Sequence, residues 1–260
     1  MNQKIITIIT VVYNAKADLA LTLNSLSCQT FKDFEYLIID GGSSDGTQDI
    51  VDKYDSIVTK LVSERDFGIY HAMNKGILLA NGRYLLFLNA GDQLYSPNTL
   101  MQARPFLEKS EEDFIYGTEA VLVYGEVLKK KPLKFSQLWK GMPFSHQSVF
   151  IKTEFHKTEL YDLSFKIGAD YNLIYKSFMS KRTFKKIDQV IAIVSPGGVS
   201  DVRRVQCFNE RLKTHSNYPL TFKTQAYYRY LILDACLRIF LKKMLPAALV
   251  KKIILLKYTK

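Results

Sequence analysis

The residues best suited to chemistry in this sequence are acidic side chains that directly follow stretches typical of buried strands. Residues 84–88 form one such stretch, and Asn89-Ala90-Gly91-Asp92 follows it with a carboxylate beside a glycine. In an open α/β sheet ligands bind at the carboxyl ends of strands, where a carboxylate can hold a divalent cation or accept a proton. The same four residues also make an ordinary turn that ends a strand. On this motif alone, a ligand site and an ordinary turn are equally good interpretations.

Two further strand ends carry acids, namely Asp40, and Glu64 with Asp66. Strand-like and helix-like stretches alternate as far as Asp92 with short connections, which is typical of a doubly wound parallel sheet. Right-handed crossovers place the carboxyl ends of such strands along one edge, so these acids are expected to share one crevice. The expected strands are residues 5–13, 34–40, 59–63 and 84–88, with helices around 19–26, up to about 54 and over 70–79.

Beyond the fourth strand the pattern changes, and the sheet is expected to become mixed. Residues 114–123 and 126–128 flank a turn and predict an antiparallel ribbon. His146 and Gln147 come just before another strand, and Asp170 lies in the first turn of a helix. A carboxylate in a first turn is commonly only a dipole partner or cap, and on its own Asp170 would be interpreted in that way. Further elements are expected over 97–107 (helix), 190–194 (strand) and 203–215 (helix).

The composition predicts a folded α/β protein in a reducing compartment. The chain has 260 residues, of which 47% are apolar, and this is enough for a sizeable core in one domain with an appendage. Cys28, Cys207 and Cys236 lack metal-ligand spacing and are interpreted as buried thiols. The first residues show no signal-peptide cleavage site, and no uninterrupted apolar run of about 18 residues occurs. A cytoplasmic protein without a spanning helix is therefore expected.

The net charge of +11 predicts an anionic partner, which can be nucleic acid, a phosphorylated substrate or a membrane surface. From residue 226 to the end, eight basic residues stand against one acidic residue, Asp234, and apolar residues recur between them. This pattern favours residues 216–260 as a basic amphipathic helical tail on an anionic membrane surface, although a helix packed on the domain has the same pattern. Nucleic acid is disfavoured, because the basic residues are not interleaved with stacking aromatics on a groove.

Four motifs occur in an order that points to a family. They cover residues 10–14 (TVVYN), 40–47 (DGGSSDGT), 63–77 (SERDFGIYHAMNKGI) and 87–92 (FLNAGD). Together they resemble glycosyltransferase family 2, over roughly residues 4–200. The resemblance implies the GT-A fold, with a doubly wound, mostly parallel but mixed central sheet flanked by helices. The residue pattern of the tail adds a C-terminal amphipathic helical appendage. Residues 1–215 would form this domain, with a nucleotide-binding half (1–110) and an acceptor-binding half (111–215).

The resemblance also implies an activity, which is the inverting transfer of a sugar from a nucleotide diphosphate sugar to a hydroxyl group of an acceptor. A UDP-sugar donor and a lipid-linked glycan acceptor in surface polysaccharide biosynthesis are expected, at the inner face of the cell membrane. Asp170 resembles the catalytic base, and Asp92 the last acid of the metal motif. The other residues carried over are Val11, Tyr13 and Asp40 for the nucleobase; Asp66, Gly68, Asn74 and Lys75 for ribose and diphosphate; Asn89, Ala90 and Gly91 in the donor motif; His146 and Gln147 facing donor sugar and acceptor; and Gly197, Gly198 and Ser200 in a closing loop.

This chemistry needs a base and a cation. A sugar hydroxyl is a weak nucleophile, so a carboxylate such as Asp170 must take its proton as the oxygen attacks. A divalent metal ion, Mn²⁺ or Mg²⁺, anchored by Asp92 would stabilise the departing diphosphate. The usual motif has two or three acids, whereas Asn89 and Gly91 occupy the neighbouring places here. The second metal ligand is therefore open, and His146 is one option.

Other function classes are compatible with parts of the pattern. A sugar nucleotidylyltransferase uses a related sheet, but it generally carries a Gly- and Arg-rich loop after the first strand, where this chain has Asn14-Ala15-Lys16. A non-catalytic protein that binds nucleotide sugars would need the same donor pocket without a base. Pyrophosphate release from nucleotide sugars would indicate the first alternative.

Overall fold

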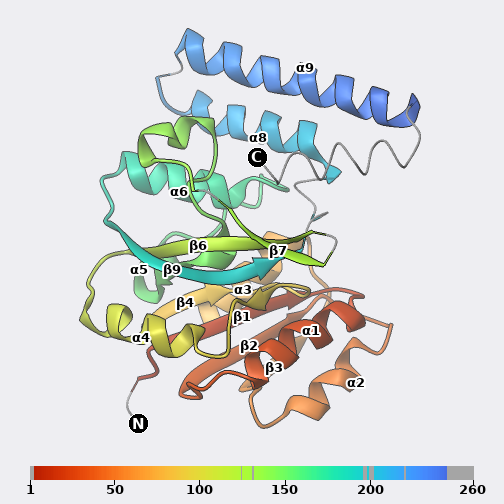
Figure 1. Cartoon of the computed structure of the whole chain (residues 1–260), viewed down its shortest axis with the longest axis vertical. Helices are drawn as coiled ribbons and strands as arrows, with labels where there is room; N and C mark the ends of the chain where they lie inside the picture. The colour runs from red at the N-terminus through yellow and green to blue at the C-terminus, as the bar shows by residue number, and fades with distance from the viewer. Residues whose placement is uncertain are drawn as a thin grey trace.

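A computed structural model gives the fold of the chain (Figure 1). It describes residues 3–123, 125–130, 132–195, 198, 202–219 and 221–244, with the backbone alone over 240–244. The predicted closing-loop residues Gly197 and Ser200, and residues 245–260 of the predicted tail, lie outside the described residues.

The first part of the chain forms the expected parallel sheet. All seven residues of β1 and all seven of β2 are buried, as their apolar, β-branched sequences predict for strands covered on both faces. These two strands lie at the centre of the order β3-β2-β1-β4, and all three pairings are parallel. The elements are β1 (Ile6–Val12), α1 (Lys16–Ser27), β2 (Phe34–Asp40), α2 (Thr47–Val51), η1 (Asp52–Tyr54), β3 (Lys60–Ser63), α3 (Ile69–Leu79) and β4 (Tyr84–Phe87).

The second part extends the same sheet with mixed directions, which confirms the expected fold class. Beyond β4 the order continues β8-β6-β9-β5, with β7 paired to β6 as the predicted antiparallel ribbon. Two features differ from the expectation: β9 starts at Phe184 rather than near residue 190, and the two-residue strand β5 was not expected. The strands are β5 (Gln93–Leu94), β6 (Phe114–Val123), β7 (Glu126–Lys129), β8 (Val149–Lys152) and β9 (Phe184–Val194).

Helices cover both faces of the sheet. Leu19, Leu23 and Leu26 of α1 share one buried cluster with residues of α2 and α4. The other cluster contains residues of α3, α5, α6 and η2, including Ala169 and Tyr171. The remaining bounds are α4 (Thr99–Lys109), η2 (Phe135–Lys140), η3 (His146–Ser148), α5 (Thr153–Thr158) and α6 (Ala169–Met179).

Two further helices, α8 (Arg204–Ser216) and α9 (Phe222–Met244), lie at the end of the molecule opposite α1 and α2 (Figure 1). The helix α8 contacts α6, and α9 contacts α8. Tyr228 is fully buried and its hydroxyl lies 3.4 Å from that of Tyr171, so the first half of α9 is anchored to the rest of the protein. No helix in the described part of the chain is both long and apolar enough to cross a membrane.

The prediction of three buried thiols is wrong for two of them. Cys207 is buried, whereas Cys28 and Cys236 are exposed. Cys28 is the C-cap of α1, two residues past Leu26, the last residue of the apolar stripe of that helix. Cys236 follows the buried Ala235 on α9 and lies on the outward side. The prediction used only the residue type, and cysteine at or near the surface of a helix can face solvent as well as the core.

Candidate active site

The turn from β4 to β5 holds the carboxylate of Asp92 at the carboxyl edge of the sheet. Gly91 has φ +95°, a left-handed conformation that favours glycine. The hydroxyl of Thr22 on α1 accepts a hydrogen bond from the Gly91 N–H (3.0 Å) and donates to the Asp92 carbonyl oxygen (2.8 Å). Gln147 donates its side-chain N–H to Asp92 Oδ2 over 3.0 Å. The carboxylate therefore has a fixed position, and Asp92 is only 6% exposed.

Burial has a strong electrostatic effect on Asp92. It raises the pKa of the carboxyl group to about 6, although Gln147 and the charge of His146 act in the opposite direction. At neutral pH the group is ionised at a free-energy cost. A cation bound beside it would favour the ionised form.

A second acid, Asp170, is connected to this turn through His146. The Asn89 side-chain N–H donates to His146 Nε2 (3.0 Å), and His146 Nδ1 lies 3.4 Å from Asp170 Oδ2. Burial lowers the pKa of His146, but the Asp170 carboxylate outweighs it, so the pKa is raised. The imidazole thus bridges the end of β4 and the start of α6, two segments about eighty residues apart in the sequence.

Asp170 is held ionised at the first turn of α6. Its Oδ1 accepts hydrogen bonds from the Tyr171 N–H (2.7 Å) and the Tyr70 hydroxyl (3.3 Å). Burial alone would raise the pKa of the carboxyl group, but His146 and the Tyr171 N–H outweigh it, so the pKa lies below its usual value. A carboxylate that is ionised and partly exposed, with 22% of its side chain accessible, can accept a proton from a bound molecule.

Glu210 on α8 fixes the turn that precedes Asp170, a role that sequence reasoning missed. Its Oε2 accepts hydrogen bonds from the backbone N–H groups of Lys166 (3.0 Å), Ile167 (2.9 Å) and Gly168 (2.8 Å). Burial would raise the pKa of Glu210, yet these N–H groups lower it below the ordinary value. One carboxylate thereby satisfies three backbone donors ahead of α6.

Replacing Glu210 is expected to loosen this turn. Glu210→Ala leaves three backbone N–H groups without an acceptor, so the free energy of unfolding should fall by about 3 kcal/mol. Glu210→Gln keeps one acceptor oxygen and should cost about 1 kcal/mol. Urea unfolding measures both, with Asn209→Ala, an exposed position on the same helix, as the control. Equal stability of Glu210→Ala and Asn209→Ala would show that Glu210 does not hold the turn.

The other strand ends bring several predicted residues together. Asp40 is fully buried, and its carboxylate accepts hydrogen bonds from the Ser43 N–H (3.1 Å) and the Ser63 hydroxyl (2.5 Å). Asp66 Oδ1 forms an ion pair with Lys75 Nζ at 2.7 Å. A Cβ atom on Gly41 would lie 3.1 Å from Asp66 Oδ2 and 3.3 Å from Tyr13 Cδ2, so glycine lets these side chains approach. Tyr13, which is 66% exposed, forms the outer wall of this edge.

Not every predicted residue lies in the crevice. The Asn74 amide is occupied at both ends, since it donates to the Tyr161 carbonyl oxygen (2.9 Å) and accepts from the Tyr161 N–H (2.9 Å). Val11 is buried in the core cluster below the edge. Gly68 stands before α3 with φ +123°, and nothing lies within 4 Å of an added Cβ. The family motif includes all three positions, but the Asn74 amide is already occupied by its hydrogen bonds to the backbone of Tyr161.

Glu119 on β6 is a second acid near Asp92 that sequence reasoning missed. It is 6% exposed, forms an ion pair with Lys130 Nζ at 2.5 Å, and its Oε2 is buried without a hydrogen-bond partner. Its charge acts on the pKa of both Asp92 and His146. The predicted ribbon carries it, but a glutamate in a ribbon usually faces solvent, so the sequence offered no signal.

The donor set at the turn fits a hard divalent cation with few protein ligands. Among the described residues, no three His, Cys, Asp or Glu side chains form a group that could hold a metal ion. However, Asn89, which lies on the same turn as Asp92, has a buried Oδ1 without a hydrogen-bond partner. Carboxylate and amide oxygens are the ligands that Mg²⁺ and Mn²⁺ prefer. Asp92 and Asn89 are therefore the residues that fit such an ion.

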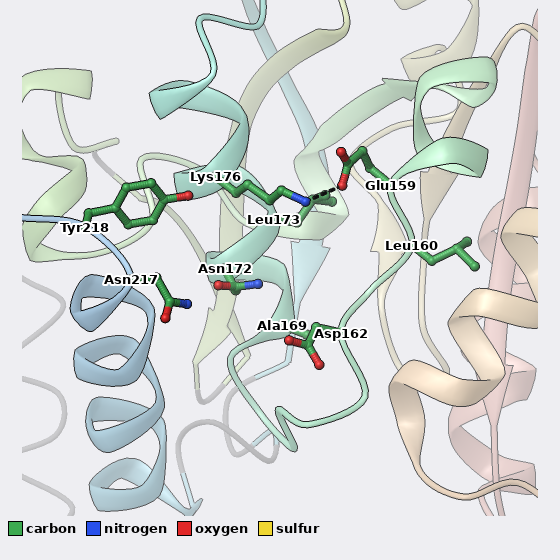
Figure 2. A pocket seen from close by; sticks show the side chains of 9 residues that line it. All are labelled: Glu159, Leu160, Asp162, Ala169, Asn172, Leu173, Lys176, Asn217 and Tyr218. Carbon is green, nitrogen blue, oxygen red and sulfur yellow. Dashed lines mark hydrogen bonds and ion pairs between the residues drawn. The ribbon is translucent and has the colours of Figure 1, made fainter.

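A cavity of about 350 Å³ lies on the other side of α6 and is not part of this crevice. Figure 2 shows Lys176 reaching toward Glu159 across it, at an Nζ–Oε2 distance of 2.6 Å. Its lining contains none of Asp92, His146 or Asp170.

Comparisons with known proteins agree on one family. The family described as Glycosyl transferase family 2 matches residues 7–177. A PGL/p-HBAD biosynthesis glycosyltransferase of Mycobacterium bovis is 32% identical over 176 residues, covering 64% of this chain and 66% of the relative. The Escherichia coli UDP-Glc:alpha-D-GlcNAc-diphosphoundecaprenol beta-1,3-glucosyltransferase WfgD is 26% identical over 146 residues, covering 54% and 57%. The chain thus spans about two thirds of these relatives or less.

Solved structures with the same fold come from two further organisms. S. aureus TarS 1-349 in complex with UDP-GlcNAc matches with a TM-score of 0.65 at 18% identity, covering 88% of this chain and 70% of that one. The mannosyltransferase PcManGT from Pyrobaculum calidifontis, in complex with GDP-Man and Mn²⁺, matches with a TM-score of 0.63 at 18% identity, covering 98% and 81%. With the sheet order, the motifs and the family match taken together, the chain belongs to glycosyltransferase family 2 and has the GT-A fold.

Proposed function

We propose that this protein is an inverting glycosyltransferase that moves a sugar from a UDP-sugar to a hydroxyl group of a lipid-linked glycan. The observation that carries the proposal is the pair of acids in one crevice: Asp170, which is ionised, and Asp92, whose pKa is raised to about 6. The first suits a general base, and the second suits a cation site that neutralises a diphosphate.

The donor would lie along the carboxyl edge of β1, β2 and β4. In this arrangement Tyr13 stacks against the uracil ring, and Asp40 accepts a hydrogen bond from the ring N–H. Lys75, which is paired with Asp66 at 2.7 Å, reaches the diphosphate. These roles follow the family motifs, and the convergence of Tyr13 and Asp66 over Gly41 supports them. The UDP-GlcNAc complex of TarS supports this class of donor.

The transfer step needs one proton acceptor and one bond exchange. Asp170 takes the proton of the acceptor hydroxyl as the oxygen bonds to the anomeric carbon on the face opposite the diphosphate. The bond between that carbon and the diphosphate oxygen breaks, and its electron pair stays with the diphosphate. A divalent cation held by Asp92 and Asn89 would supply positive charge for this leaving group. His146 orients the Asp170 carboxylate through the 3.4 Å contact.

The acceptor is proposed to come from a membrane. WfgD acts on a diphosphoundecaprenol-linked sugar, as its name states, and this chain is similar to WfgD over 146 residues. Residues 216–260 would form the membrane-facing part beside a catalytic domain of residues 1–215. On α9 the exposed apolar residues Tyr230, Leu233 and Leu237 recur at helical spacing. The exposed Arg229 lies among them, so apolar burial and attraction to anionic lipid can act together.

A calorimetric screen of UDP-, GDP- and dTDP-sugars, each with and without Mn²⁺, tests the proposed function. We expect a UDP-sugar to bind and Mn²⁺ to tighten the binding. Binding with release of pyrophosphate would instead support a nucleotidylyltransferase. If no nucleotide sugar binds under any condition, the proposed function is wrong.

The membrane surface of α9 gives a separate prediction. Leu233→Glu combined with Leu237→Glu should reduce co-sedimentation with anionic vesicles by roughly tenfold or more, because two apolar side chains no longer enter the lipid interface. Leu21→Glu, at a similarly exposed leucine on α1 at the far end of the molecule, should leave it unchanged. Equal sedimentation of all three proteins would contradict the prediction.

A further inference from the structure

Arg211 places a positive charge beside Asp170 without an acidic partner. Its guanidinium carbon lies 5.2 Å from the centre of the Tyr171 ring, and Nη1 is 3.1 Å from where a Cβ on Gly141 would be. Its Nε is buried and has no hydrogen-bond partner. Among the described residues no carboxylate lies within 4.0 Å of its nitrogen atoms. The free protein thus holds a half-buried guanidinium without an ion-pair partner where α8 packs on α6.

An anion would give this guanidinium the partner that it lacks among the described residues. Burial lowers the pKa of the guanidinium, but Cys207, Tyr228 and Asp170 outweigh it and raise the pKa. Of these groups only Asp170 is a carboxylate, and Asp170 is engaged with His146. A cation lying over an aromatic ring recovers only part of the solvation that an unpaired guanidinium loses. A phosphate group is the ligand that suits a forked guanidinium in such a place.

A phosphate bound by Arg211 could belong to the sugar donor or to the acceptor, and the position of Arg211 favours one of the two. Arg211 belongs to α8, which packs on α6 and lies at the end of the molecule opposite α1 and α2 (Figure 1). In the proposed inverting transfer the attacking hydroxyl and the leaving diphosphate lie on opposite faces of the sugar. An anion on the α8 side of Asp170 therefore belongs to the acceptor rather than to the donor.

We infer that Arg211 binds a phosphate of the acceptor, and that the hydroxyl glycosylated by this protein belongs to a sugar close to a lipid phosphate or diphosphate. The inference rests on the proposed function, since it takes Asp170 as the base. Arg211 then sets how far the reacting hydroxyl stands from the lipid phosphate. The same contact excludes neutral glycans, which leave the guanidinium unpaired.

The test measures binding of decyl diphosphate to protein saturated with UDP and Mn²⁺, so that the donor site is closed to the probe. Wild-type protein should bind decyl diphosphate at least tenfold more tightly than decyl glucoside. Arg211→Gln should weaken decyl diphosphate binding roughly 10- to 100-fold, the loss expected for one charge-assisted contact. Arg211→Lys should recover part of it. Lys213→Gln, which removes a charge from the same helix, where Lys213 lies over Phe165 and bonds Ser164, should have no effect.

The outcomes separate the two proposals. If UDP binds but wild-type protein shows no preference for the diphosphate, the inference on Arg211 is overturned while the proposed function stands. The same holds if Arg211→Gln binds decyl diphosphate as wild type does. If UDP itself does not bind, both fail. Should Arg211→Gln not fold, the wild-type preference and its loss with rising salt still decide the question.

Discussion

Asp170→Asn is expected to lower the rate of sugar transfer by roughly 10²- to 10⁴-fold, the usual contribution of a general base. An asparagine keeps the shape of the side chain and an oxygen that can accept from the Tyr171 N–H and the Tyr70 hydroxyl. It cannot take a proton from the acceptor. UDP-sugar affinity should therefore stay near the wild-type value, because none of the residues proposed to bind the nucleotide forms a hydrogen bond with Asp170.

The measurement combines transfer kinetics with calorimetric titration of UDP-sugar. Asp162→Asn is the matched control, since Asp162 precedes the same helix but lines the cavity in Figure 2 rather than the crevice. The lowered pKa of Asp170 also predicts that its protonation limits the rate only below the usual range of an aspartate. A variant with full transfer activity would remove Asp170 from the role of base.

The sequence predicts the carboxyl edge of the parallel strands well, because the residues that define each strand end are local. Strands buried on both faces give continuous apolar runs, so Asp40 and Asp92 could be placed at strand ends from the sequence alone. The pairings β2-β1-β4 then bring these ends to one edge. The parallel half of the fold needed no long-range information beyond the handedness of the crossovers.

The contacts of α8 could not be predicted in the same way. Glu210 and Arg211 are neighbours on a helix with mostly polar residues, where charges usually face solvent. The packing of α8 on α6 buries Glu210 and half-buries Arg211, and their partners Gly168 and Tyr171 lie forty or more residues earlier in the sequence. Glu119 depends on the pairing of β6 with β9, which is interrupted by register shifts. These residues take their roles from contacts between distant segments, which one sequence does not reveal.

The β9 strand shows the same limit on a smaller scale. Its first residues are half-exposed or exposed apart from the buried Ile187, and they include Lys185, Lys186 and Asp188, so only the apolar end at 190–194 has the composition of a strand. Pairing with β6 supplies the missing stability. The expected strand at 190–194 was thus the part of β9 whose own residues are typical of a strand.

Asp92→Asn is expected to abolish the effect of Mn²⁺ on donor binding and, at the same time, to make the free protein more stable at neutral pH. The folded-state pKa of about 6 exceeds the ordinary value of 3.8, so the folded state binds the Asp92 proton more tightly than the unfolded state does. This contribution to stability is complete below about pH 4 and is lost as the pH rises through about 6. At pH 7.5 the ionised group therefore costs up to about 3 kcal/mol, which a neutral asparagine avoids.

Urea unfolding at pH 5 and pH 7.5 measures this effect, with Asp18→Asn as the control. Asp18 is an exposed acid beside the same turn, since its Cβ lies 3.6 Å from where a Cβ on Gly91 would be. Asp92→Asn should gain more stability at pH 7.5 than at pH 5, whereas Asp18→Asn should change little at either. A loss of stability at pH 7.5 would mean that the Gln147 hydrogen bond outweighs burial and that Asp92 has a structural role. A gain would mean that the protein keeps a destabilising carboxylate at the end of β4, which is the expected compromise where a residue is retained for binding a cation.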